Sequence, residues 1–231
     1  MLERSRTVLI PAGLGIACVL VSLGFYAALH FVSPSAELDW SRRTISHYAL
    51  LENGWWFDAA TLLLAAGSVG VLVAALRSGV MRGGAAVAFG LWVAGLVGVV
   101  WFEKHNWSVG PSVSGDVHRV ASVVAFLSLP VAALGAAARS LRDTAARWVA
   151  LGGLVSLLCF TPILWAVLAE PWTGVRWWRA IPLGGVERLL GLAEVVTVVL
   201  IAAWAVVSRS SRAPASGPGS GVRPSRTPPF A

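Results

Sequence analysis

Several polar and ionisable side chains of this sequence lie inside long apolar stretches, and they are its first candidates for chemistry. Ser22, Tyr26 and His30 recur every four residues in the first stretch, so they share one face of a helix. Ionisable groups are costly inside a membrane-spanning segment, and by default they mark binding or proton-transfer sites. The pattern predicts an outward-facing polar pocket. Its candidate residues are Tyr26, His30, Ser46, His47, Asp58, His118, Glu187, Arg188 and Glu194.

Glu194 is the member of this set that helix ends explain least. Glu187 stands at the start of the last apolar stretch, where the helix dipole favours an anion. Glu194 lies on the same face about 10 Å deeper, beyond the first turn to which the dipole effect is confined. We therefore expect Glu194 at the floor of the pocket. Its expected partners are Tyr26, His30 and Arg188, and a purely structural hydrogen bond between helices is the alternative.

A metal site is a second hypothesis. Four side chains of metal-ligand type surround one predicted loop: Glu103, His105, Asp116 and His118. Their spacing matches no signature such as HExxH, and helix capping or dipole matching explains several of them without chemistry. A haem between His30 and His118 is the other cofactor considered, and no motif requires zinc or haem.

His118 is expected inside the bundle, close to the start of the last apolar stretch. A histidine that binds a ligand or metal needs an orienting partner for its other ring nitrogen. The candidates at the same predicted depth are Asp58, Asp116 and Glu187.

Serine chemistry has only one starting point, the adjacent residues Ser46 and His47. Adjacent side chains seldom face one another, and the sequence contains no GxSxG nucleophile elbow. A Ser–His–acid triad is therefore not favoured by the sequence.

The composition indicates which elements must position these residues. Of the 231 residues 57% are apolar and 13% charged, whereas soluble domains are 45–50% apolar and about a quarter charged. This apolar, weakly charged composition excludes an ordinary soluble enzyme, a disordered chain and a typical nucleic-acid-binding domain. We expect an all-α, six-transmembrane-helix bundle formed by residues 1–207 as one domain. The predicted spans are 7–32, 55–76, 85–102, 118–138, 148–168 and 186–207.

Charge distribution predicts how the chain crosses the membrane. Eleven of the 18 basic residues fall in the two ends of the chain and in the loops near residues 77–84 and 139–147. By the positive-inside rule this predicts a plasma-membrane protein with both termini cytoplasmic and with lipid as its partner. Residues 208–231, rich in Ser, Pro, Gly and Arg, are expected to form a disordered cytoplasmic tail. The preference for Arg over Lys is typical of a high-GC bacterial genome.

The sequence resembles the bacterial and archaeal membrane-protein family known as domain of unknown function 998. The likeness spans about Pro11–Val207, and the segment Glu103–Asn106 departs from the family pattern. The motifs that carry it are Arg43–Tyr48, Asn53–Phe57, His118 with Gly115 before it, Ala125–Pro130 and Gly185–Arg188. The resemblance implies a six-helix fold and topology, and it implies no reaction.

Three functions are compatible with these observations. The first is a binding protein that holds a lipid headgroup or small polar ligand between the outer helix ends. The second is a membrane-embedded hydrolase or transferase that acts on lipid through the His/Glu/Asp cluster, with or without a metal. The third is a small transporter, a class that usually requires broken helices near the membrane midplane.

Overall fold

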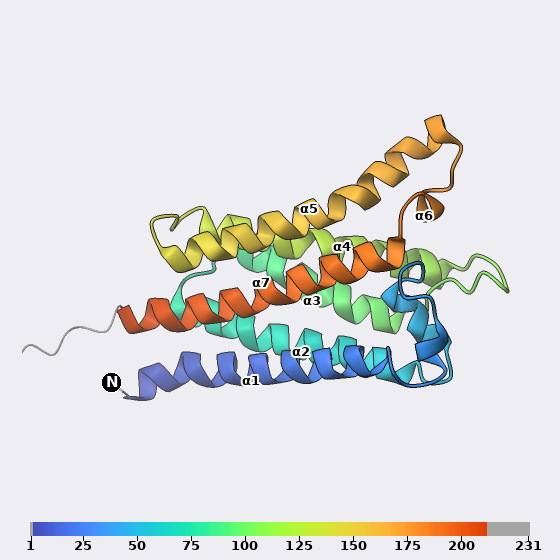
Figure 1. The fold of residues 1–231 in the computed structure, drawn as a ribbon. Coiled ribbons are helices and arrows are strands. Elements are labelled where there is room, and N and C mark those ends of the chain that lie inside the picture. The colour runs from blue at the N-terminus through green and yellow to red at the C-terminus, as the bar shows by residue number, and fades with distance from the viewer. Residues whose placement is uncertain (1, 212–231) are drawn as a thin grey trace, which may run out of the picture.

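The computed structural model describes residues 2–211, and it consists of helices joined by loops (Figure 1). Within this part of the chain, six helices are long and apolar enough to cross a membrane, so the prediction of a six-helix membrane protein is confirmed. The long helices are α1 (Leu2–Ala28), α2 (Trp55–Ser78), α3 (Gly84–Trp101), α4 (Val113–Ala137), α5 (Thr144–Thr173) and α7 (Leu183–Ser211). The short elements are η1 (Ser35–Glu37), η2 (Ile45–Leu50) and α6 (Trp177–Ala180).

Several helix boundaries differ from the predicted ones. Helix α1 ends at Ala28, so His30 lies beyond it. Helix α4 begins at Val113, five residues before the predicted start, because the Ser112 Oγ accepts the Gly115 N–H at 3.0 Å and caps the first turn. Helix α5 continues to Thr173 and ends at Gly174, whose φ of 65° suits a left-handed helix cap. The expected tail from residue 208 begins as the last turn of α7, and its remainder lies outside the described residues.

The long helices form a bundle whose two ends differ (Figure 1). Both ends of the described chain lie at one end of the bundle, which we call the terminal end. The opposite end carries the connections 29–54, 102–112 and 174–182, and we call it the loop end. Helix α5 packs against α4 and α7, and its later half leaves the bundle before α6 returns the chain to α7.

Helices α1 and α2 pack closely because glycine residues face one another across their contact. A Cβ atom on Gly15 would lie 2.7 Å from the Gly67 carbonyl oxygen, and a Cβ on Gly67 would lie 2.7 Å from that of Gly15. Small residues let membrane helices approach so that backbone and side chains pack well. This contact places the Tyr26 face of α1 against α2.

The contact predicts a position-specific loss of stability. Gly15→Ala is expected to lower the free energy of unfolding by about 1–3 kcal/mol, because the added methyl group overpacks the α1–α2 contact. Gly13→Ala is the matched control, since a Cβ at Gly13 meets nothing within 4 Å. The measurement is denaturant unfolding in detergent micelles. Equal stability of the two variants would contradict the glycine contact.

Candidate binding cavity

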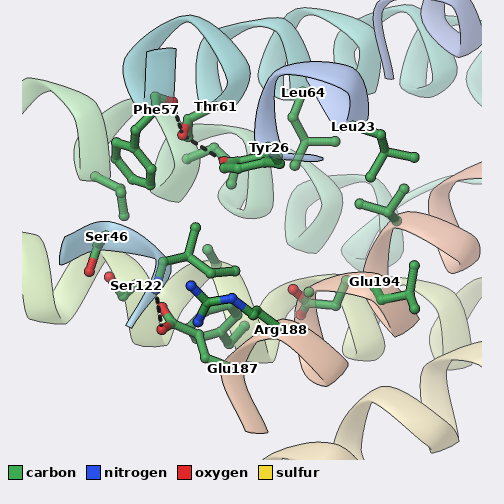
Figure 2. Close-up of a pocket in the computed structure, with 18 of the residues that line it drawn as sticks. Leu23, Tyr26, Ser46, Phe57, Thr61, Leu64, Ser122, Glu187, Arg188 and Glu194 are labelled. Atoms are coloured by element: carbon green, nitrogen blue, oxygen red, sulfur yellow. Dashed lines mark hydrogen bonds between the residues drawn. The ribbon is translucent and has the colours of Figure 1, made fainter. Parts of the chain in front are cut away.

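A cavity of about 190 Å³ lies between α1, α2, α3, α4, α7 and η2 (Figure 2). Most of its lining is apolar, with Leu23, Phe57, Leu64, Trp92 and Leu96 among the lining residues. Six of the nine predicted pocket residues line it: Tyr26, His30, Ser46, Glu187, Arg188 and Glu194. The structure therefore brings these six together, in a cavity more apolar than the sequence indicated.

Glu194 is fully buried at this cavity, with 0% of its surface exposed. Neither carboxyl oxygen has a hydrogen-bond partner among the described residues. The expected partners are wrong, because the Tyr26 hydroxyl pairs with the Thr61 hydroxyl at 2.7 Å and Arg188 donates to His30 instead. In Figure 2, Glu194 and Arg188 lie on the α7 side of the cavity, opposite Tyr26 and Thr61.

Arg188 fixes the loop 29–54 over the start of α7. Its Nη1 donates to the carbonyl oxygens of Trp40 and Arg43, both at 2.8 Å, and to that of Gly184 at 3.0 Å. Its Nη2 donates to the Tyr48 hydroxyl at 2.9 Å, and the guanidinium also lies 5.4 Å from the centroid of the Tyr48 ring. One side chain thus joins several points of the loop to α7.

His30 and Gly184 complete this junction. Arg188 Nε donates to His30 Nε2 at 3.1 Å, so a neutral His30 carries its proton on Nδ1, which lies 2.9 Å from the Tyr26 carbonyl oxygen. A Cβ on Gly184 would lie 2.2 Å from the Arg43 carbonyl oxygen, so the loop approaches α7 too closely for any other residue type. These contacts hold the side chains of His30 and Arg188, which line the cavity.

Glu187 and Lys104 form a second polar group at the loop end. The Glu187 Oε2 accepts the Ile45 N–H at 2.8 Å. The Lys104 Nζ contacts the Thr44 hydroxyl and donates to the Ser46 Oγ at 3.2 Å. Burial lowers the pKa of Lys104, and the charge of Glu187 opposes this shift.

Lys104 is a site residue that the sequence did not indicate. Lys104 is the single lysine of the chain, and this was the only feature of the sequence that could have indicated a role in the site. Its contact with Ser46 joins residues 58 positions apart, and such a contact cannot be inferred from spacing.

Three of the predicted pocket residues, His47, Asp58 and His118, do not line the cavity. His118 is buried as expected, but its Nδ1 pairs with the Phe102 carbonyl oxygen at 2.9 Å instead of an acidic side chain. Its Nε2 is buried without a partner among the described residues. The predicted orienting role of Asp58, Asp116 or Glu187 is therefore wrong.

The proposed metal ligands do not assemble. Among the described residues, no group of three or more His, Cys, Asp or Glu side chains could hold a metal ion. His105 Nε2 lies 3.3 Å from Asp116 Oδ1, and its Nδ1 accepts the Ser112 N–H at 3.0 Å. The His105 ring lies beside Trp107, with 5.0 Å between ring centroids. These contacts fasten the loop 102–112 to the start of α4.

Comparison with known protein families identifies the chain. A family model described as "Protein of unknown function (DUF998)" matches residues 16–208. The chain belongs to this family. The match spans the six long helices from within α1 onward, which agrees with the resemblance noted in the sequence. Comparison with curated proteins and with solved structures finds no match.

Replacing Arg188 should release the loop 29–54 from α7. Arg188→Met keeps an unbranched apolar stem but removes every hydrogen bond of the guanidinium, so proteolysis within the loop should become faster. Arg42→Met is the matched control, because Arg42 is exposed and its guanidinium makes one long hydrogen bond among the described residues, 3.4 Å to the Arg179 carbonyl oxygen. Limited proteolysis followed by peptide mapping measures the difference. Equal cleavage rates in the two variants would show that Arg188 does not hold the loop.

His47 predicts a pH dependence of stability. Burial, with Lys104 and Arg43 nearby, lowers the pKa of His47 to about 4, whereas the unfolded chain has a pKa of about 6.5. The unfolded state therefore binds more protons between these values, and stability falls as the pH decreases through this window. When unfolding is measured at pH 7.5 and at pH 5, His47→Gln should lose less stability between the two pH values than the unmodified protein does. Identical losses of stability in the two proteins would contradict the lowered pKa of His47.

Proposed function

We propose that this membrane protein binds a small amphiphilic amine in the cavity beneath the loop 29–54. The ammonium group lies at Glu194, and the apolar part of the ligand packs against the leucine and aromatic side chains. The observation that carries the proposal is the buried Glu194 carboxyl group, which lines the cavity and has neither oxygen hydrogen-bonded to any of the described residues.

The cavity volume limits the size of the ligand. An engineered apolar cavity of about 150 Å³ binds benzene, and the cavity here measures about 190 Å³. This space suits one ring or a short alkyl chain with a polar group attached. The apolar lining favours such an amphiphile over a wholly polar ligand and over a complete phospholipid.

The charges around the cavity favour a cationic group on the ligand. Four of the five N–H groups of Arg188 are needed for its contacts with the loop, His30 and Gly184. Lys104 contacts the hydroxyl groups of Thr44 and Ser46. Within residues 2–211, Glu194 has no cationic partner. A buried carboxylate is strongly stabilised by a paired, hydrogen-bonding ammonium.

The orientation follows from the charge distribution. The basic loops near residues 77–84 and 139–147 lie at the terminal end, together with both ends of the described chain. The positive-inside rule places this end in the cytoplasm. The loop end and the cavity then face the outside of the plasma membrane, with lipid around the bundle.

The other two functions have unequal support. The contact between Ser46 and Lys104 favours an additional hydrolytic activity. The transporter alternative called for helices broken near the midplane, but Pro11, Pro130 and Pro162 lie within helices that continue past them. No specific contact in the described structure favours transport.

The binding proposal predicts a charge-dependent affinity. Benzylamine and benzyl alcohol have similar apolar parts, and only benzylamine carries a cation at neutral pH. We expect benzylamine to bind the protein in lipid nanodiscs more tightly than benzyl alcohol, and Glu194→Gln to weaken benzylamine binding by at least about tenfold, or 1.4 kcal/mol. Titration calorimetry, with empty nanodiscs subtracted, measures both affinities.

Glu170→Gln is the matched control, because Glu170 pairs with Arg176 at 3.3 Å and does not line the cavity. It should bind benzylamine as the unmodified protein does. Equal benzylamine affinities for Glu194→Gln and Glu170→Gln would contradict the proposal, and so would tighter binding of benzyl alcohol.

A further inference from the structure

A serine and a lysine meet at the loop end of the cavity. Ser46 is supplied by η2 and lines the cavity (Figure 2). The Lys104 Nζ, from the loop after α3, lies 3.2 Å from the Ser46 Oγ. This is the distance over which a lysine amine and a serine hydroxyl exchange a proton.

We propose that Ser46 is a nucleophile and Lys104 its general base, and that together they hydrolyse a short acyl ester bound in the cavity. Serine–lysine pairs are a known variant of the serine–histidine–acid arrangement. This activity uses the same cavity as the binding proposal but does not depend on Glu194.

The surroundings of Lys104 suit a base. A lysine amine accepts a proton only when it is neutral, and lysines used as bases are those whose pKa is lowered by burial. Burial lowers the pKa of Lys104, and the nearby charge of Arg43 acts in the same direction. The charge of Glu187 opposes them and keeps the protonated form accessible after proton transfer.

The reaction balances with the ester and water alone. The Ser46 Oγ attacks the acyl carbon while its proton passes to the neutral Lys104 Nζ. The ester C–O bond then breaks, and the alcohol leaves with the proton returned by Lys104. In the second half, Lys104 accepts a proton from a water molecule that attacks the acyl–Ser46 ester. The bond between the acyl carbon and the Ser46 Oγ then breaks, and Lys104 returns its proton to that oxygen. This releases the acid and regenerates the Ser46 hydroxyl and the neutral Lys104 amine.

The backbone of Ser46 fits the same step. Its N–H has no hydrogen-bond acceptor among the described residues. In serine proteases the N–H of the nucleophilic residue itself stabilises the oxyanion that forms on the acyl group. The amide of Ser46 is available for this contact.

A fluorophosphonate with a short alkyl chain tests the pair, because it modifies an activated serine covalently. The full-length protein in nanodiscs is expected to gain one adduct by intact mass, which peptide mapping places on Ser46. Lys104→Arg keeps the charge but cannot act as a base at neutral pH, so it should lower the labelling rate by about 10²–10⁴-fold. Ser122→Ala is the matched control, since Ser122 lines the cavity but donates to its own helix, at the His118 carbonyl oxygen.

The pH dependence separates a base from a structural contact. Labelling of the unmodified protein should increase with pH and reach half its maximum below the ordinary lysine pKa, and this transition should be absent in Lys104→Arg. Lys104→Met serves as a second variant if Lys104→Arg fails to fold, which thermal unfolding reports. The proposal is overturned if the folded protein is not labelled, if the adduct lies on another residue, or if the folded lysine variant keeps the same rate and pH profile. Benzylamine binding to the unmodified protein is measured beside the labelling, so failure of this activity is distinguishable from failure of the binding proposal.

Discussion

The contact between the Arg188 guanidinium and the loop 29–54 is the interaction on which the cavity depends. Five hydrogen bonds join this one side chain to His30, to Tyr48 and to three backbone carbonyl oxygens. The Trp40 and Arg43 carbonyl groups belong to the loop, and the guanidinium satisfies these two acceptors where the loop meets the start of α7. The loop in turn supplies Ile45 and Ser46 to the cavity wall.

The same arrangement explains why Arg188 does not pair with Glu194, whose carboxyl oxygens have no hydrogen-bond partner among the described residues. Arg188 is the cation nearest along the helix, but its N–H groups are directed toward the loop end, away from Glu194. Leaving a buried polar group without a partner costs about 1–3 kcal/mol, and more when it is charged. Glu187 is bonded to the Ile45 amide, whereas Glu194, seven positions further along the helix, has no hydrogen-bond partner in the described part of the chain. In the binding that we propose, a ligand that supplies the missing hydrogen bond offsets this cost.

The sequence predicted those features that depend on local pattern. Six apolar stretches of sufficient length predicted six helices, and the shared face of Glu187 and Glu194 predicted that both would line one cavity. Prediction from the sequence failed where tertiary contacts determine the position or partner of a residue. The Ser112 cap moved the start of α4, the Phe102 carbonyl took the place expected for an acid beside His118, and Lys104 reached Ser46 from a distant loop. Spacing alone cannot indicate which backbone carbonyl a side chain will meet.

The most direct test of the account concerns the Glu194 carboxyl group itself. Infrared difference spectroscopy, recorded as benzylamine is added to the protein in nanodiscs, detects changes in carboxyl protonation and hydrogen bonding. The account predicts a change in carboxyl bands for the unmodified protein that is absent from Glu194→Gln and retained in Glu170→Gln. A spectrum in which the Glu194→Gln variant shows the same carboxyl change, or in which saturating benzylamine produces none, would contradict it.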